Sequence, residues 1–134
     1  MQRTEKLKKL IPLQSSEAVI ISKPSNIFYL SGFKGEGLLY ISDNLSAVVT
    51  DFRYVEQAQK ESPGWRVESI HTGVDHFKVA SSLENGIKKV YLEDDFVTLK
   101  QYRRMEECFD KAQLASLNGI PEKMRTIKDE SEIA

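Results

Sequence analysis

The stretch from Ser46 to Gln59 reads S-A-V-V-T-D-F-R-Y-V-E-Q-A-Q. The apolar run at 47–49 predicts a strand that ends at Asp51, and a helical pattern begins just after it. Polar residues in this position matter because open α/β sheets collect their ligands at the carboxyl ends of strands. The stretch therefore predicts an α/β fold, and it raises the question of whether Asp51, Arg53 and Tyr54 perform chemistry or hold a corner together.

Strands and helices alternate along most of the remaining chain. We expect strands over 18–21, 38–41, 47–50, 65–70, 89–93 and 112–117. We expect helices over 4–11, 53–61, 75–83 and 98–109, and a single helical turn within 26–32. Because helices separate most strands, the predicted fold is a three-layer α/β/α domain with a mostly parallel sheet. The hairpin signal at Asp43-Asn44 makes the sheet mixed.

Composition limits the class of protein. The chain has 134 residues, which suits one domain, and 40% hydrophobic residues, which is ordinary for a soluble globular protein. A formal net charge of -1 argues against nucleic acid or an anionic membrane as a partner. The single cysteine, Cys108, excludes an intramolecular disulfide and fits a reducing compartment. The apolar runs are too short for a membrane span, so we infer a cytoplasmic protein.

The last residues predict a linker and the start of a second domain. We expect residues 1–122 to form the domain and 123–134 to connect it onward, with Met124, Arg125 and Ile127 extended. Asp129 and Glu132 then form a helix cap and its partner three residues later. A helix of about five residues is not stable alone. The simplest interpretation is a chain that belongs to a longer protein.

Metal-ligating residues are sparse in the sequence. His71 and His76 lie five residues apart without a nearby cysteine, which does not match structural zinc spacing. Five carboxylates lie near predicted strand ends and could hold divalent ions: Glu36, Asp51, Glu93, Asp94 and Asp95. The alternative, which we favour, is an acidic turn beside a helix cap. Nucleophilic catalysis and phosphate binding lack a motif, because no G-x-S-x-G is present and Gly35-x-Gly37 lacks a third glycine.

The segment from Asn26 to Phe33 and the corner at Asp51 also have structural interpretations. Asn26 would cap the turn that follows it, and Gly32 would supply a positive φ or permit close packing. Asp51 would accept the first amides of a helix. Arg53 would pair with Asp51 or with Glu56, and the ring of Tyr54 would lie in the core with its hydroxyl at the rim. Phe33 and Lys34 differ, since they lie in a glycine-containing loop of the kind that often carries binding residues.

Three ordered blocks resemble one known family. The block at 26–33 (N-I-F-Y-L-S-G-F) resembles the N-terminal signature of the creatinase/prolidase/aminopeptidase P superfamily. The block at 50–58 (T-D-F-R-Y-V-E-Q-A) resembles the second signature of that domain, and 125–133 (R-T-I-K-D-E-S-E-I) resembles its junction with the catalytic domain. Ser31 departs from the family pattern, in which Thr is frequent, but it keeps a hydroxyl. The resemblance covers nearly the whole chain.

The resemblance implies a domain with a ribonuclease H-like core, joined to a metallopeptidase that cleaves bonds next to proline. It implies an Xaa-Pro dipeptidase or aminopeptidase whose two divalent ions, manganese or cobalt, are held in a pita-bread domain beyond Ala134. Two Asp, one His and two Glu would hold the ions there, so the resemblance assigns no metal ligand and no catalytic residue to this chain. The expected partners are the protein's own catalytic domain, a second subunit in a homodimer, and proline-containing peptides as substrate.

The resemblance also implies that this domain borders an active-site entrance or a subunit interface. The residues expected there are Tyr29, Phe33, Lys34, Arg53 and Tyr54. Asn26, Gly32 and Asp51 are expected to be structural signature residues. The same domain occurs in creatine amidinohydrolase and in the large subunit of a histone chaperone that has no peptidase activity. A peptide- or protein-binding module is therefore the alternative function, and a carboxylate-metal nuclease is a third and weaker hypothesis.

Overall fold

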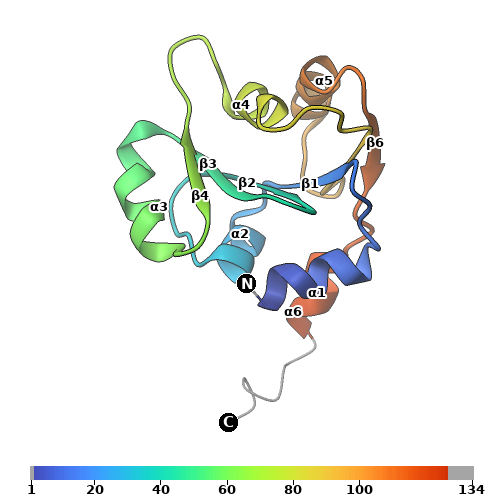
Figure 1. Ribbon diagram of the computed structural model, residues 1–134, viewed down its shortest axis with the longest axis horizontal. Helices are drawn as coiled ribbons and strands as arrows, with labels where there is room; N and C mark the ends of the chain where they lie inside the picture. The colour runs from blue at the N-terminus through green and yellow to red at the C-terminus, as the bar shows by residue number, and fades with distance from the viewer. Residues whose placement is uncertain (1, 127–134) are drawn as a thin grey trace.

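Six strands form one mixed sheet in the order β4-β3-β2-β1-β5-β6 (Figure 1). The computed structural model describes residues 2–126. The strands are β1 (Glu17–Ile21), β2 (Gly37–Ser42), β3 (Ser46–Thr50), β4 (Arg66–Ser69), β5 (Lys89–Leu92) and β6 (Gln113–Ser116). The helices are α1 (Gln2–Leu10), α2 (Pro24–Ser31), the 3-10 helix η1 (Phe52–Tyr54), α3 (Val55–Glu61), α4 (His76–Ser82), α5 (Leu99–Cys108) and α6 (Ile120–Thr126).

Strand direction confirms the predicted mixed, mostly parallel sheet. β1, β2 and β3 form an antiparallel meander, while β1 with β5, β5 with β6 and β3 with β4 are parallel pairs. Every strand except β2 therefore points the same way. Their carboxyl ends share one edge of the sheet with the start of β2, and this edge brings the corner at Asp51 and the turn after β5 to the same side of the domain.

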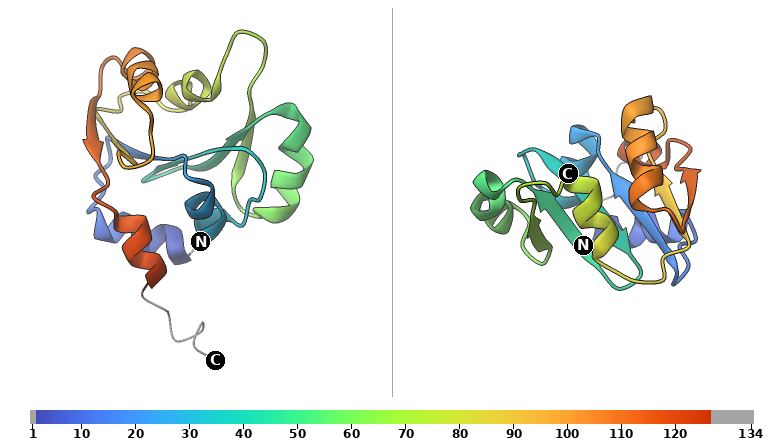
Figure 2. Two further views of the ribbon diagram at one scale, coloured as in Figure 1. Left: turned by 180° about the vertical axis from the view of Figure 1, so that it is seen from behind. Right: turned by 90° about the horizontal axis from the view of Figure 1, so that it is seen from above.

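Helices cover both faces of the sheet, as the three-layer prediction requires. Figures 1 and 2 show α4 and α5 on one side, with α1, α2 and α6 on the other. The strands β1, β2 and β3 are buried along nearly their whole length, so their residues alternate between two cores. Val19 and Ile21 of β1 pack in the core that contains Leu7 of α1 and Ala58 of α3, whereas Ile20 packs in the other core.

The prediction of an extended segment at Met124 and Arg125 is wrong. These residues lie in α6, which follows a turn where Asn118 and Gly119 adopt positive φ values of 54° and 70°. Pro121 stands in the first turn of α6, where a missing amide N–H costs no helical hydrogen bond. The helix buries Met124, which is only 1% exposed in the core. The helix start predicted at Asp129 lies outside the described residues.

Candidate functional site

The corner after β3 is a capped turn. Asp51 is the N-cap of η1, and its Oδ1 accepts hydrogen bonds from Arg53 N at 2.9 Å and from Arg53 Nε at 3.0 Å. Both hydrogen bonds lower the pKa of Asp51, and the bond from the Arg53 backbone has the larger effect. The guanidinium carbon of Arg53 lies 5.6 Å from the ring centroid of Tyr54. The predicted cap at Asp51 and the predicted Asp51–Arg53 pair are both confirmed.

The loop at 33–37 packs tightly against this corner. Phe33 is 1% exposed, and its ring meets that of Tyr54 edge to face at 6.4 Å. Gly35 lies beside both rings, since a Cβ there would come within 2.5 Å of Phe33 Cζ and 2.9 Å of Tyr54 Cδ1. Lys34 N donates to Glu61 Oε1 at 2.8 Å, which binds the loop to α3. The loop thus holds a fixed conformation in which the side chain of Phe33 is core and that of Lys34 is exposed.

Helix α2 ends beside the same loop. Gly32 has a φ of +83°, and its amide donates to Phe28 O at 2.8 Å, so the predicted positive φ is confirmed. A Cβ at Gly32 would also lie 2.7 Å from Glu61 O. Phe28 is 51% exposed, and Lys34 Nζ lies 5.8 Å from its ring centroid. An exposed aromatic ring and an ammonium group therefore stand together at the end of α2.

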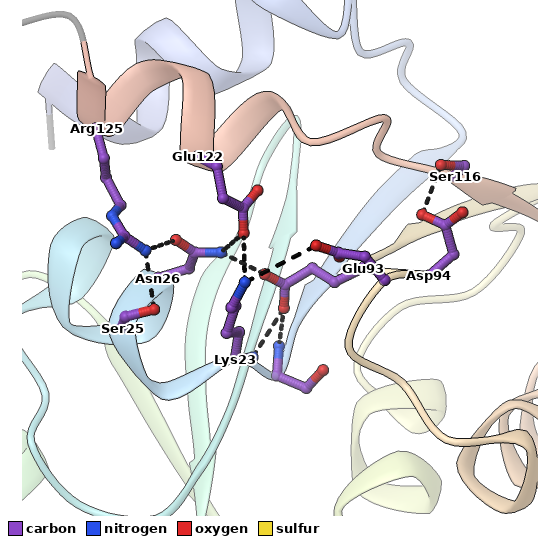
Figure 3. Close-up of polar contacts among 10 residues, drawn as sticks. Lys23, Ser25, Asn26, Glu93, Asp94, Ser116, Glu122 and Arg125 are labelled. Carbon is purple, nitrogen blue, oxygen red and sulfur yellow. Dashed lines mark hydrogen bonds and ion pairs between the residues drawn. The ribbon is translucent and has the colours of Figure 1, made fainter.

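A buried carboxylate lies at the start of α2 (Figure 3). Glu93 is 2% exposed and accepts hydrogen bonds from Ser22 N at 2.6 Å and from Lys23 N at 2.8 Å. A third bond comes from Asn26 Nδ2, also at 2.6 Å. Burial raises the pKa of Glu93, and these hydrogen bonds oppose that shift. Glu93 therefore satisfies the backbone N–H donors that precede α2. A negative group is favourable at this end of a helix.

Asn26 joins this carboxylate to α6. Its Nδ2 also donates to Glu122 Oε1 at 2.7 Å, and its Oδ1 accepts from Arg125 Nη1 at 2.8 Å. Lys23 Nζ donates to the same Glu122 oxygen at 3.2 Å. Asn26 lies inside α2, whose N-cap is Lys23, so the prediction that Asn26 caps a turn is wrong. Its partners are 67 to 99 residues away in sequence, which no local pattern indicates.

Within residues 2–126, no group of three His, Cys, Asp or Glu is placed to hold an ion, which was the less favoured interpretation of the five carboxylates. Glu93 is occupied by three protein donors. Asp94 Oδ1 accepts from Ser116 Oγ at 2.6 Å, and Asp95 lies 3.8 Å from Lys23 Nζ. These acidic residues therefore stabilise turns in the part of the chain that the structure describes.

The two histidines and the cysteine differ in burial. His71 is exposed, whereas His76 begins α4 and is half-buried. Burial lowers the pKa of His76, although nearby Asp75, Asp51 and Glu36 oppose the shift. Cys108, the last residue of α5, packs against the core, and its burial raises the pKa of the thiol. Among the described helices, none is long and apolar enough to cross a membrane.

Comparison with known proteins identifies the family. The model of the creatinase/prolidase N-terminal domain matches residues 3–127, and the chain belongs to this family. The uncharacterized peptidase YqhT of Bacillus subtilis is 32% identical over 98% of this chain and 37% of its own length. An uncharacterized peptidase of Staphylococcus epidermidis is 24% identical over 99% of this chain and 39% of its own length. The chain thus spans well under half of the curated relatives that it matches.

Solved structures show the same fold. The Xaa-Pro dipeptidase from Bacillus anthracis aligns with a TM-score of 0.86 and 30% identity, over 99% of this chain and 38% of its own. The X-Pro aminopeptidase from Thermotoga maritima aligns with a TM-score of 0.81 and 30% identity, over 96% of this chain and 37% of its own. The N-terminal domain of cytoplasmic peptidase PepQ from Mycobacterium tuberculosis aligns with a TM-score of 0.80 and 27% identity, over 92% of this chain and 98% of its own.

Proposed function

We propose that this chain is the non-catalytic N-terminal domain of a metal-dependent Xaa-Pro peptidase, whose parent enzyme hydrolyses peptide bonds next to proline. The observation that carries the proposal is the family match over 3–127, together with relatives of which the chain covers 37% and 38%. Two of the matching structures are an Xaa-Pro dipeptidase and an X-Pro aminopeptidase. The remaining length of such proteins leaves room for a separate catalytic domain.

The proposal assigns the two divalent ions, manganese or cobalt, to the domain that follows Ala134. Bound there, such ions would activate water for attack on the peptide bond. The described part of this chain is consistent with that assignment, because its buried carboxylate, Glu93, already accepts three hydrogen bonds from the protein. These three bonds use most of the acceptor positions of that carboxylate. The residues of this domain therefore have a supporting role.

That role is to border the active-site entrance and to contribute to a homodimer. Lys34 and Arg53 are exposed cations at the carboxyl edge of the sheet. Tyr54 and the buried Phe33 hold them in a fixed frame through their edge-to-face contact. Tyr29 is half-buried beside α6, and the proposal assigns it to the border with the following domain. Cytoplasmic location belongs to the same proposal, and the PepQ relative is described as cytoplasmic.

The test uses the 134-residue chain with Mn²⁺ or Co²⁺ and an Xaa-Pro dipeptide. The proposal expects no turnover above the metal-only control. Metal-dependent hydrolysis that copurifies with the chain would overturn it. Sedimentation at micromolar concentration tests the dimer in the parent enzyme, where a monomer would contradict that part of the proposal.

A peptide- or protein-binding module without catalysis is the second candidate function. The observation that favours it is exposed aromatic surface, since Phe52 is 74% exposed and Phe28 is 51% exposed. Aromatic residues are enriched at protein interfaces. Titration of the chain with peptides distinguishes the two functions. Micromolar affinity for a peptide that lacks proline would favour the module, and no binding would favour the accessory domain.

A further inference from the structure

One buried asparagine joins helix α6 to the rest of the domain. Asn26 is fully buried and donates to Glu93 Oε2 at 2.6 Å and to Glu122 Oε1 at 2.7 Å. Its side-chain oxygen accepts from Arg125 Nη1 at 2.8 Å, as Figure 3 shows. An amide side chain has two N–H donors at one end and an oxygen at the other. These contacts therefore occupy both ends of Asn26 and fix which end faces the carboxylates.

The chemistry of this position favours Asn over residues of similar size. An Asp side chain has the same shape but no N–H donor, so it would place a third carboxylate against Glu93 and Glu122. A Leu side chain would leave both carboxylates without that donor. Removing one partner from a buried charged group is strongly destabilising, because the remaining group has lost its water as well. Asn26 thus donates hydrogen bonds to both carboxylates, which neither Asp nor Leu can do.

Further contacts hold α6 along its length. Lys23 Nζ donates to Glu122 Oε1 at 3.2 Å near the start of the helix. Tyr29 OH donates to Met124 O at 3.3 Å near its end, and the side chain of Met124 is 1% exposed. Lys23, Asn26 and Tyr29, which make these bonds to α6, lie in α2 or at its N-cap. Helix α6 is therefore docked on α2, and it also packs against α1.

We propose that Asn26 is a positioning residue: by fixing α6 it sets the orientation of the domain that follows, and through that orientation the geometry of the entrance to the catalytic site. The inference rests on the proposed function, because only a following catalytic domain gives this orientation a catalytic consequence. The contact between Asn26 and α6 is observed within the described chain. The effect of Asn26 on α6 can therefore be measured in the 134-residue chain, and its effect on catalysis can be measured in the parent enzyme.

The variant Asn26→Asp gives the proposal a distinctive pH signature. The titratable and charged groups around the site are Glu93, Glu122, Lys23, Arg125, Asp94 and Asp95. At about pH 8 the variant would bring three ionised carboxylates together, and α6 would separate. At about pH 5 the cluster would take up a proton, and one carboxyl could then donate to its neighbour. Asn26→Leu cannot recover in this way.

Hydrogen exchange of the 134-residue chain tests the contact itself. We expect Asn26→Asp to lower the protection factors of the α6 amides about tenfold or more at about pH 8, with recovery at about pH 5. Protection in α5 should stay at the wild-type level, as should α6 protection in the matched control Asn85→Asp, whose position is exposed. Arg125→Ala is a milder second variant that removes one contact of Asn26 together with the bond to Ser25 Oγ. Unchanged α6 protection in both variants would overturn the proposal, as would an Asn26→Asp loss that equals that of Asn26→Leu at both pH values.

Kinetics of the parent enzyme test the consequence. We expect kcat/KM for an Xaa-Pro dipeptide to fall in Asn26→Asp relative to wild type at about pH 8, and the ratio to recover towards about pH 5 in parallel with α6 protection. An unchanged kcat/KM in a variant whose α6 has lost protection would overturn the positioning role. A wild-type parent without Xaa-Pro hydrolysis would overturn the proposed function and the catalytic half of this inference, whereas the exchange measurement still decides whether Asn26 fixes α6.

Discussion

The side-chain amide of Asn26 donates to Glu93 Oε2 at 2.6 Å across 67 residues of sequence. This bond joins α2 to the turn that follows β5. The same carboxylate accepts the amides of Ser22 and Lys23, which follow β1. Two neighbouring parallel strands therefore end on one carboxylate, and a residue type that serves as a metal ligand in many enzymes here organises the carboxyl edge of the sheet.

Gly35 is required because no side chain fits between two aromatic rings. We expect Gly35→Ala to destabilise the domain by about 1–3 kcal/mol, since its Cβ would overlap Phe33 and Tyr54 unless the rings move. Urea unfolding monitored by circular dichroism measures the change. The control is Gly86→Asn, where a Cβ meets nothing within 4 Å and Asn tolerates the φ of +78°. Equal stability of Gly35→Ala and wild type would show that the loop is not fixed by this contact.

The capping box of α5 gives a second stability prediction. Thr98 accepts from Gln101 N at 3.1 Å, and Gln101 Oε1 accepts from Thr98 N at 2.9 Å. Thr98→Ala should lower the free energy of unfolding by about 1 kcal/mol, because the Gln101 amide loses its partner, the Thr98 hydroxyl. The exposed helix residue Lys100 offers a control, and Lys100→Ala should stay within about 0.5 kcal/mol of wild type. A Thr98→Ala protein as stable as that control would contradict the prediction.

His76 should make stability depend on pH. Burial holds its pKa in the folded protein below the ordinary value of 6.5. Between the folded pKa and 6.5 the unfolded chain binds more protons, so stability falls as pH drops through this window and is full above it. We expect the urea midpoint of wild type to fall more steeply from about pH 7.5 to about pH 5.5 than that of His76→Gln. The exposed control His71→Gln should retain the wild-type slope, and identical slopes for His76→Gln and wild type would contradict the prediction.

Lys34 and Arg53 should affect substrate binding in the parent enzyme. We expect Lys34→Ala and Arg53→Ala each to raise KM for an Xaa-Pro substrate about fivefold while kcat changes little, because each removes about 1 kcal/mol of charge-assisted contact at the entrance. Lys111→Ala is the matched control, since this exposed lysine lies in the loop before β6. Steady-state kinetics at constant ionic strength give the comparison. KM values that match the control for both variants would exclude an entrance role.

Local patterns predicted most of the fold because they reflect local physics. The apolar runs at 18–21 and 47–49 correctly predicted the buried strands β1 and β3, and the Thr98 capping box correctly predicted the start of α5. Helix α6 was missed because its stability comes from Met124 in the core and from contacts with α2 rather than from helix propensity. Short helices depend on such tertiary packing.

The site was predictable in part for the same reason. The role of Asp51 as a cap is local, since its partner Arg53 is two residues away. The role of Asn26 is not local, because all three of its side-chain bonds to Glu93, Glu122 and Arg125 cross long stretches of chain. A buried asparagine in an otherwise apolar helical turn was the available signal, since buried polar groups need partners. Sequence alone does not say where such partners lie.

The measurement that tests the central claim most directly is Mn²⁺-dependent hydrolysis of an Xaa-Pro dipeptide, measured side by side for the 134-residue chain and for its parent protein. The account predicts turnover by the parent that is abolished by a chelator, and none by the chain alone at equal concentration. Turnover by the chain alone, or a metal-loaded parent that does not cleave next to proline, would contradict it.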